Sequence, residues 1–196
     1  MEGKKIFVSG EGNVLSGYNL FKRMETGNEI QQTAYKAVNE LGIFNELSMY
    51  NPVLCGTLPI GIDVEGSDLD VIMEVQELND FKDRLQSLYS SKESFKIKTT
   101  TIRNKEVIKA NFIFNNFEFE LFGQDQPVHK QHAYLHMVIE LELLQQDSKL
   151  RENVVKLKQQ GYKTEPAFCE ILGITGDPYA GLIQFGVEKG IITDVL

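Results

Sequence analysis

The sequence predicts an α+β protein: a mixed β-sheet flanked by helices, with a helical C-terminal part. Before Gly123, segments of helical and of strand periodicity alternate, whereas after Gly123 nearly every segment has helical periodicity. The length of 196 residues and the 42% hydrophobic content suit one folded domain, or one domain with a helical appendage. We expect a loosely patterned N-terminal arm over residues 1–27, an α/β core over residues 28–123 and a helical region packed on the core over residues 124–196.

The predicted core contains two helices and five strands. Helical spacing of apolar residues predicts helices over Gln31–Leu41, with Gly42 as the C-cap, and over Leu78–Tyr89. A short apolar run and several alternating segments predict the strands. They are Pro52–Gly56, Asp68–Val75, Phe95–Ile102, Val107–Phe114 and Phe117–Phe122.

Four further helices are expected beyond Gly123. The first two lie at about residues 129–147 and 149–160. The third begins at Thr164 as the N-cap, with a proline in its first turn. The fourth starts after Asp177-Pro178.

The charge balance limits the classes of partner. Lys and Arg number 20 against 28 Asp and Glu, a net charge of −8, which argues against an extended nucleic-acid surface and against an anionic-membrane binder. No apolar run reaches the roughly 18 residues of a membrane-spanning helix, and Ile6-Phe7-Val8 is too short for a signal peptide. Cys55 and Cys169 are expected to be reduced and buried, which favours a cytoplasmic protein.

Two carboxylates stand at alternate positions of the second predicted strand. Side chains at i and i+2 point to the same face, so Asp68 and Asp70 are close enough to share divalent ions. Oxygen ligands of this kind suit Mg²⁺, or Mn²⁺, which proteins commonly hold through one or two carboxylates and substrate phosphates. The preceding Gly56-Thr57 offers a tight turn, a hydroxyl and backbone N–H groups to an anionic triphosphate.

A third carboxylate would complete such a site. Glu118 and Glu120 lie on one face of an otherwise apolar strand, where an acidic side chain is expensive to bury unless it is paired or binds a metal. One of them is expected to be the third ligand. We favour Glu120, which is nearer the end of the strand, while a solvated strand edge would explain either residue.

The arrangement resembles the nucleotidyltransferase superfamily, which has the DNA-polymerase-β-like fold. Its signature is a Gly-[Gly/Ser] pair followed, nine to thirteen residues later, by an acid-apolar-acid strand; here Gly56-Thr57 precedes Asp68-Leu69-Asp70 by ten residues. Ser67 is also typical. Several further segments resemble the uncharacterised bacterial family called domain of unknown function 4269. They are Ala34-Tyr35, Gly56 to Asp70, Glu118 to Gln124, Gln131 to Met137, Lys163 to Phe168 and Gly176 to Tyr179.

The resemblance implies a nucleotide-binding site, but this sequence differs at one point from catalytically active members of the superfamily. Gly56, Thr57 and Ser67 would lie at the phosphates. Many active members carry an arginine in the following loop, but this loop has no Lys or Arg and adds Asp63 and Glu65. A basic contact would then come from a neighbouring strand. The candidates are Lys109, Lys96, Lys98 and Arg103.

The histidines and the C-terminal lysines have two interpretations each. His129, His132 and His136 follow helical spacing, which fits either a zinc site or two exposed residues and one core histidine. In the second case His136 would be oriented by Glu140, or would line the active cleft. Its companions there would be Gln124 and Gln131. The basic side chains of the C-terminal helices suit a solvated face or an acceptor-binding surface. They are Arg151, Lys156, Lys158 and Lys163.

Three functions remain open from the sequence. The first is transfer of a nucleoside monophosphate from an NTP to an unidentified acceptor, which is a small molecule or a protein. The second is a non-catalytic binding or antitoxin-type module with the same fold, favoured by the loop without a cation. The third is a metal-dependent phosphohydrolase that uses the same carboxylates. The sequence does not choose an oligomeric state.

Overall fold

The structure is a computed structural model that describes residues 17–193. Part of the expected N-terminal arm lies outside these residues, but its last third is helical. Helix α1 spans Gly17–Arg23 and a 3-10 turn, η1, spans Met24–Thr26. Leu20, Phe21 and Met24 are buried, and this apolar burial fixes a segment that glycines made look irregular in the sequence.

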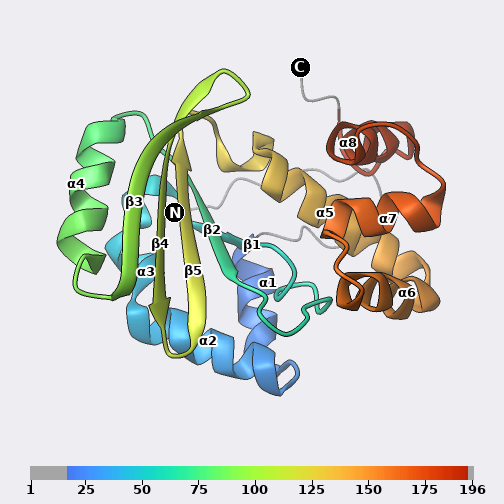
Figure 1. The fold of residues 1–196 in the computed structure, drawn as a ribbon, viewed down its shortest axis with the longest axis horizontal. Coiled ribbons are helices and arrows are strands. Elements are labelled where there is room, and N and C mark those ends of the chain that lie inside the picture. Colours follow the sequence, from blue (N-terminus) through green and yellow to red (C-terminus); the bar gives the residue numbers. More distant parts are fainter. Residues whose placement is uncertain (1–16, 194–196) are drawn as a thin grey trace.

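The sheet contains the five predicted strands in the order β1-β2-β5-β4-β3 (Figure 1). The central pair, β2 and β5, is parallel, and the other neighbours are antiparallel. The bounds differ from the prediction by a few residues. They are β1 Val53–Cys55, β2 Leu69–Glu74, β3 Glu93–Ile102, β4 Lys105–Phe114 and β5 Phe117–Gln124.

One face of the sheet is covered by the N-terminal helices. Helix α2 spans Glu29–Leu41, α3 spans Ile43–Glu46 and α4 spans Leu78–Tyr89. Their apolar side chains form one core with α1 and with the alternate positions of β2, β4 and β5, such as Val71 and Leu121. The capping box of Asn28 and the left-handed Gly42 fix the ends of α2.

The C-terminal helices form a second layer beside the other face, over β1 and β2 (Figure 1). They are α5 His132–Gln146, α6 Ser148–Gln159, α7 Thr164–Leu172 and α8 Pro178–Glu188. A separate 3-10 turn, η3 over Val128–Lys130, precedes α5. Helix α8 begins at Pro178, with Asp177 as its N-cap. The predicted N-cap of α7 is wrong: Lys163 takes that position and Thr164 is the first helical residue.

Strand register brings charged side chains to the second face. Residues opposite one another on adjacent strands point to the same side of a sheet. Lys96, Asn111, Glu120 and Asp70 are successive partners across β3, β4, β5 and β2. The C-terminal helices lie over only part of this face (Figure 1). Lys96 is exposed, and the other three side chains of the row are partly exposed. Over residues 17–193, none of the helices combines the length and apolarity that spanning a bilayer demands.

Candidate active site

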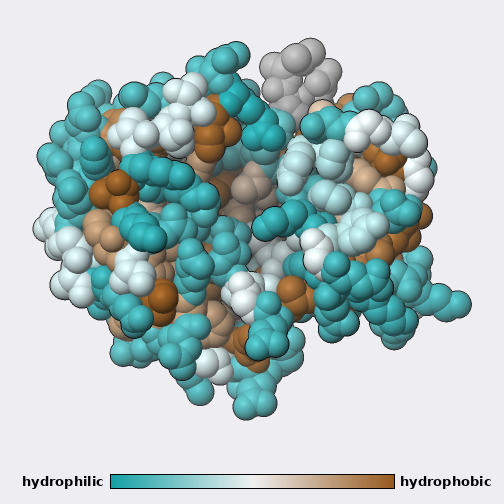
Figure 2. Space-filling model, viewed as in Figure 1, coloured by the Kyte–Doolittle hydropathy of each residue, from teal (hydrophilic) through white to brown (hydrophobic). Residues whose placement is uncertain are grey.

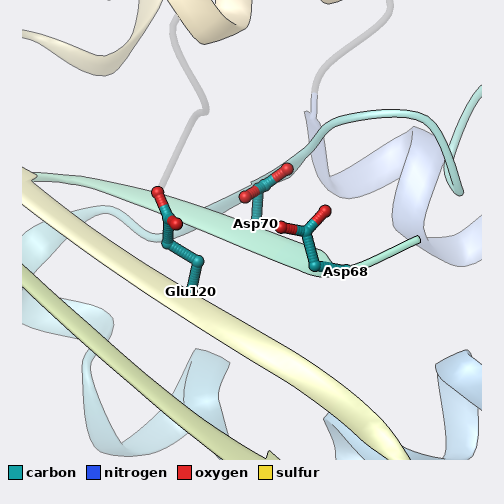
Figure 3. A group of neighbouring side chains, drawn as sticks. All are labelled: Asp68, Asp70 and Glu120. Carbon is teal, nitrogen blue, oxygen red and sulfur yellow. The ribbon is translucent and has the colours of Figure 1, made fainter. Parts of the chain in front are cut away.

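Three carboxylates converge where β2 and β5 lie side by side. Asp70 pairs in register with Glu120, and Asp68 lies just before β2 (Figure 3). One oxygen from each carboxylate lies within 4.8 Å of the others. In the described part of the chain this is the one group of three or more acidic, histidine or cysteine side chains that could hold a metal ion, so no histidine cluster of that kind is present there. Glu118 is exposed and lies outside the group.

The electrostatics of this acidic triad favour a cation. Burial raises the pKa of Asp70 to about 7, and the charges of Asp68 and Glu120 add to the rise, whereas Lys109 opposes it. The Lys109 ammonium lies 2.5 Å from the Glu120 carboxylate and neutralises one of the three charges. Lys109, which was expected to contact phosphate, is therefore engaged by the triad. A divalent ion would relieve the remaining repulsion, so the residues present fit such a metal.

The Gly56-Thr57 turn lies directly against the triad. Gly56 has a φ of +80°, and a Cβ at that position would come within 2.6 Å of an Asp70 carboxylate oxygen. Only glycine combines this backbone conformation with this close approach. The Ser67 hydroxyl accepts a hydrogen bond from the Val64 amide at 2.9 Å and lies 3.4 Å from the Thr57 hydroxyl. Ser67 therefore fixes the loop that leads back to Asp68.

A cavity of about 410 Å³ lies between this turn and the C-terminal helices; we call it the helix-side cavity. Figure 2 shows the molecule hollowed between the sheet and these helices. Gly56, Thr57, Ser67, Asp68 and Asp70 form one wall. The opposite wall comes from α5, α6 and the start of α7. Its charged side chains and its histidine are His136, Glu140, Lys158, Lys163 and Glu165.

Helix α6 supplies the cations that the loop lacks. The Arg151 guanidinium donates to the Ile60 and Gly61 carbonyls at 2.5 and 2.7 Å. The Lys158 ammonium donates to the Ile62 carbonyl at 2.8 Å and also lines the helix-side cavity. These two side chains therefore do not form a solvated face: they hold the loop against the C-terminal helices. Lys156 is exposed.

The buried histidine has a different partner from the one expected. The Nδ1 atom of His136 lies 3.2 Å from the Glu165 carboxylate, and its Nε2 atom lies 2.9 Å from the Tyr179 carbonyl. The prediction that Glu140 orients His136 is wrong. Glu140 is 3% exposed and lines the cavity, and burial, then the charge of Glu165, raises its pKa to about 8.

A second cavity of about 400 Å³ lies on the other side of Asp70; we call it the sheet-side cavity. Asp70 and Ala133 line both cavities, whereas Glu120 lines only this one. Gln124 and Gln131 lie here, so the expected trio of cleft residues is divided: His136 faces the helix-side cavity. Other polar side chains of the sheet-side cavity are Arg103, Lys105, Gln126 and His132.

Sequence reasoning did not single out Glu165 or Lys105 and did not place Lys158 at the site. Lys158 is separated by 96 positions from its bonding partner Ile62. The available signal was the cluster of basic residues in the last turns of α6. No periodicity, however, distinguishes an inward-facing lysine from a solvated one.

Solved structures of other proteins share this fold. In the solved GLD-2/RNP-8 complex, a chain matches with a TM-score of 0.51 and 15% identity, covering 88% of this chain and 65% of the other. The Cid1 poly(U) polymerase with bound MgGTP matches with a TM-score of 0.50 and 15% identity, covering 72% of this chain and 46% of the other. The fold is therefore nucleotidyltransferase-like, and the chain spans about half the length of Cid1.

The profile of the family described as "Domain of unknown function (DUF4269)" matches residues 36–185. The chain belongs to this family. A comparison with curated proteins gives no match.

Proposed function

We propose that the protein is a metal-dependent nucleotidyltransferase that moves a nucleoside monophosphate from an NTP to an acceptor hydroxyl or amine. The observation that carries this proposal is the convergence of Asp68, Asp70 and Glu120, within 4.8 Å, beside the Gly56-Thr57 turn. The nucleotidyltransferase-like fold supports it. The buried free thiols of Cys55 and Cys169 are consistent with a cytoplasmic location.

Asp68, Asp70 and Glu120 would hold Mg²⁺ or Mn²⁺. When bound, such an ion neutralises charge on the triphosphate and on the attacking oxygen. The crowded carboxylates, with the pKa of Asp70 raised to about 7, are the feature of this chain that fits it.

The NTP fits the helix-side cavity. The Gly56-Thr57 turn and Ser67 would receive the phosphates, and Lys158 and Lys163 supply positive charge from the opposite wall. The acceptor oxygen forms a bond to the α-phosphorus, and the bond from that phosphorus to the α–β bridging oxygen breaks. Pyrophosphate leaves with the electron pair, and the acceptor proton passes to the Glu120 carboxylate and on to solvent. Catalysis would come mainly from positioning and charge neutralisation.

A non-catalytic nucleotide-binding module is the second candidate. The absence of Lys and Arg between Gly56 and Asp70 favours it, as does the ion pair that occupies Glu120. A phosphohydrolase would use the same carboxylates to activate water.

One experiment separates these functions. The four NTPs are titrated with and without Mg²⁺ or Mn²⁺, and the products are analysed with an acceptor panel. Asp70→Asn should lower transfer by about a thousandfold, since a metal supplies several kcal/mol and each 1.36 kcal/mol is tenfold. Glu118→Gln is the matched control, two residues from Glu120 on the same strand, and should retain activity. NTP binding without any product would establish the module, and release of phosphate or pyrophosphate without acceptor would establish hydrolysis.

A further inference from the structure

The sheet-side cavity has the dimensions and position of a second substrate site. Its volume of about 400 Å³ lies within the roughly 300–1,000 Å³ of small-molecule sites. Asp70 and Glu120 form one end of it, so a molecule inside would reach the triad from the side opposite the helix-side cavity. Two cavities that meet at one carboxylate suit a reaction between two substrates.

Two of the side chains that line the cavity, Gln131 and His132, each carry a buried polar atom without a partner among residues 17–193. The Gln131 side chain is 1% exposed, and its amide nitrogen donates to the Met73 and Gln126 carbonyls at 2.9 Å each. These two bonds fix the amide orientation, and the side-chain oxygen is left with no hydrogen bond among residues 17–193. The His132 Nδ1 atom is likewise buried and unbonded there. These side chains give the cavity wall a polar character, and a buried polar group without a partner is unfavourable until it gains one.

The far end of the cavity is cationic. Arg103 and Lys105 are exposed at the tip of the β3–β4 hairpin, where a left-handed Arg103-Asn104 turn holds them. Neither side chain forms an ion pair or a hydrogen bond with a described residue. Burial lowers the pKa of His132, and the charges of Arg103 and His136 lower it further.

The wall between the two ends is apolar. Ile72, Ile102 and Phe122 line it, and they can cover the face of a ring. A fitting molecule therefore has an anionic group at one end, a ring-sized body, and a nucleophilic group at the other end.

We infer that the sheet-side cavity binds the acceptor and that the acceptor is a phosphate ester with a free hydroxyl. The hydroxyl lies at Glu120, and the phosphate contacts Arg103 and Lys105. This assignment rests on the proposed function, and the same bonds form and break in the transfer reaction. The ester is either a free molecule of mononucleotide size or the terminal residue of a phosphodiester chain, which have this chemistry in common.

Binding of defined probes tests the assignment without turnover. The protein is first saturated with Mg²⁺ and the NTP analogue that fills the helix-side cavity. Ribonucleoside 5′-monophosphates, ribose 5-phosphate, a trinucleotide and their dephosphorylated counterparts are then titrated calorimetrically. We expect a phosphorylated probe to bind at least tenfold more tightly than its dephosphorylated form. A tighter trinucleotide indicates a chain end as the source, and equal or weaker binding indicates a free molecule.

Charge reversal locates the site. The variant Arg103→Glu/Lys105→Glu should lose at least tenfold in probe affinity and keep its affinity for the NTP. Lys156→Glu, an exposed reversal on α6, is the matched control and should change neither. Arg103→Lys should retain most of the probe affinity, which guards against a folding defect. If the NTP binds but no phosphorylated probe does, or if the reversal leaves probe binding intact, the assignment is overturned. If no NTP binds to the wild type, the proposed function itself fails.

Discussion

The helix-side and sheet-side cavities share Asp70 but are built differently. The helix-side cavity joins the Gly56–Asp70 segment to helices more than 60 positions further along the chain. Its far wall contains the buried carboxyl group of Glu140 and the half-buried ammonium group of Lys158. The sheet-side cavity is formed largely by β2, β5, the tip of the β3–β4 hairpin and the start of α5, and its wall is more apolar. Asp70 can line two cavities because the C-terminal helices cover only part of its face of the sheet, and the proposed mechanism assigns one substrate to each cavity.

The largest expected effect concerns the shared carboxylate. Because Asp70 has its pKa raised from 3.8 to about 7, its contribution to stability is present below pH 4 and is lost as pH rises to about 7. At 1.36 kcal/mol per unit the loss is at most about 4 kcal/mol. Urea unfolding of the metal-free protein should show this decrease, and Asp70→Asn should remove it.

Mg²⁺ sharpens the same comparison. Bound Mg²⁺ should suppress the part of the pH-dependent loss of stability that Asp70 causes, because the metal favours the ionised carboxylate. Glu140 has a pKa of about 8, so its contribution to the free energy of unfolding should be lost between pH 4.5 and 8. This loss should persist in Mg²⁺ and should be absent in Glu140→Gln. A metal-free pH profile that Asp70→Asn leaves unchanged would contradict the buried, repelled state of Asp70.

The next effect concerns the boundary of the helix-side cavity. Gly56→Ala places a Cβ within 2.6 Å of Asp70 and strains a φ of +80°, which should lower the free energy of unfolding by about 1–3 kcal/mol and weaken Mg²⁺ binding. Gly66 has the same φ with no atom within 4 Å of its Cβ position. Gly66→Ala therefore measures the backbone strain alone, and denaturant unfolding with Mg²⁺ titration of both variants isolates the contact. Equal metal affinities would show that Gly56 does not position Asp70.

The smallest effect distinguishes the two cavities by charge. Lys158→Met should lower the affinity for the NTP by about tenfold, or about 1.4 kcal/mol, because it removes a partly buried cation from the helix-side cavity. Binding of phosphate-ester probes in the sheet-side cavity should not change. Lys156→Met controls for the loss of a lysine on the same helix. Calorimetry measures the binding affinities of the wild type and of both variants. A Lys158→Met variant with wild-type NTP affinity would remove this lysine from the donor site.

Local patterns predicted the strands well because alternation and turn residues act over a few positions. The β2 alternation fixed which side Asp70 faces, and Phe117–Gln124 followed the apolar spacing with only its end displaced. Helix ends were less predictable. Threonine is a favoured N-cap residue, but Lys163 is the N-cap of α7 and Thr164 is its first residue. Helix α1 depends on the burial of Phe21 rather than on any local signal.

The sequence by itself determined the acid-x-acid strand, the Gly56-Thr57 turn before it and the two acidic positions of β5, because each depends on neighbours along the chain. Only the tertiary structure decided between Glu118 and Glu120, since the choice depends on the parallel register that pairs Glu120 with Asp70. It also decided that His136 meets Glu165, that Lys158 reaches the loop and that Asp70 divides two cavities. These contacts join distant segments, and their geometry follows from how the helices pack on the sheet, which no local periodicity encodes.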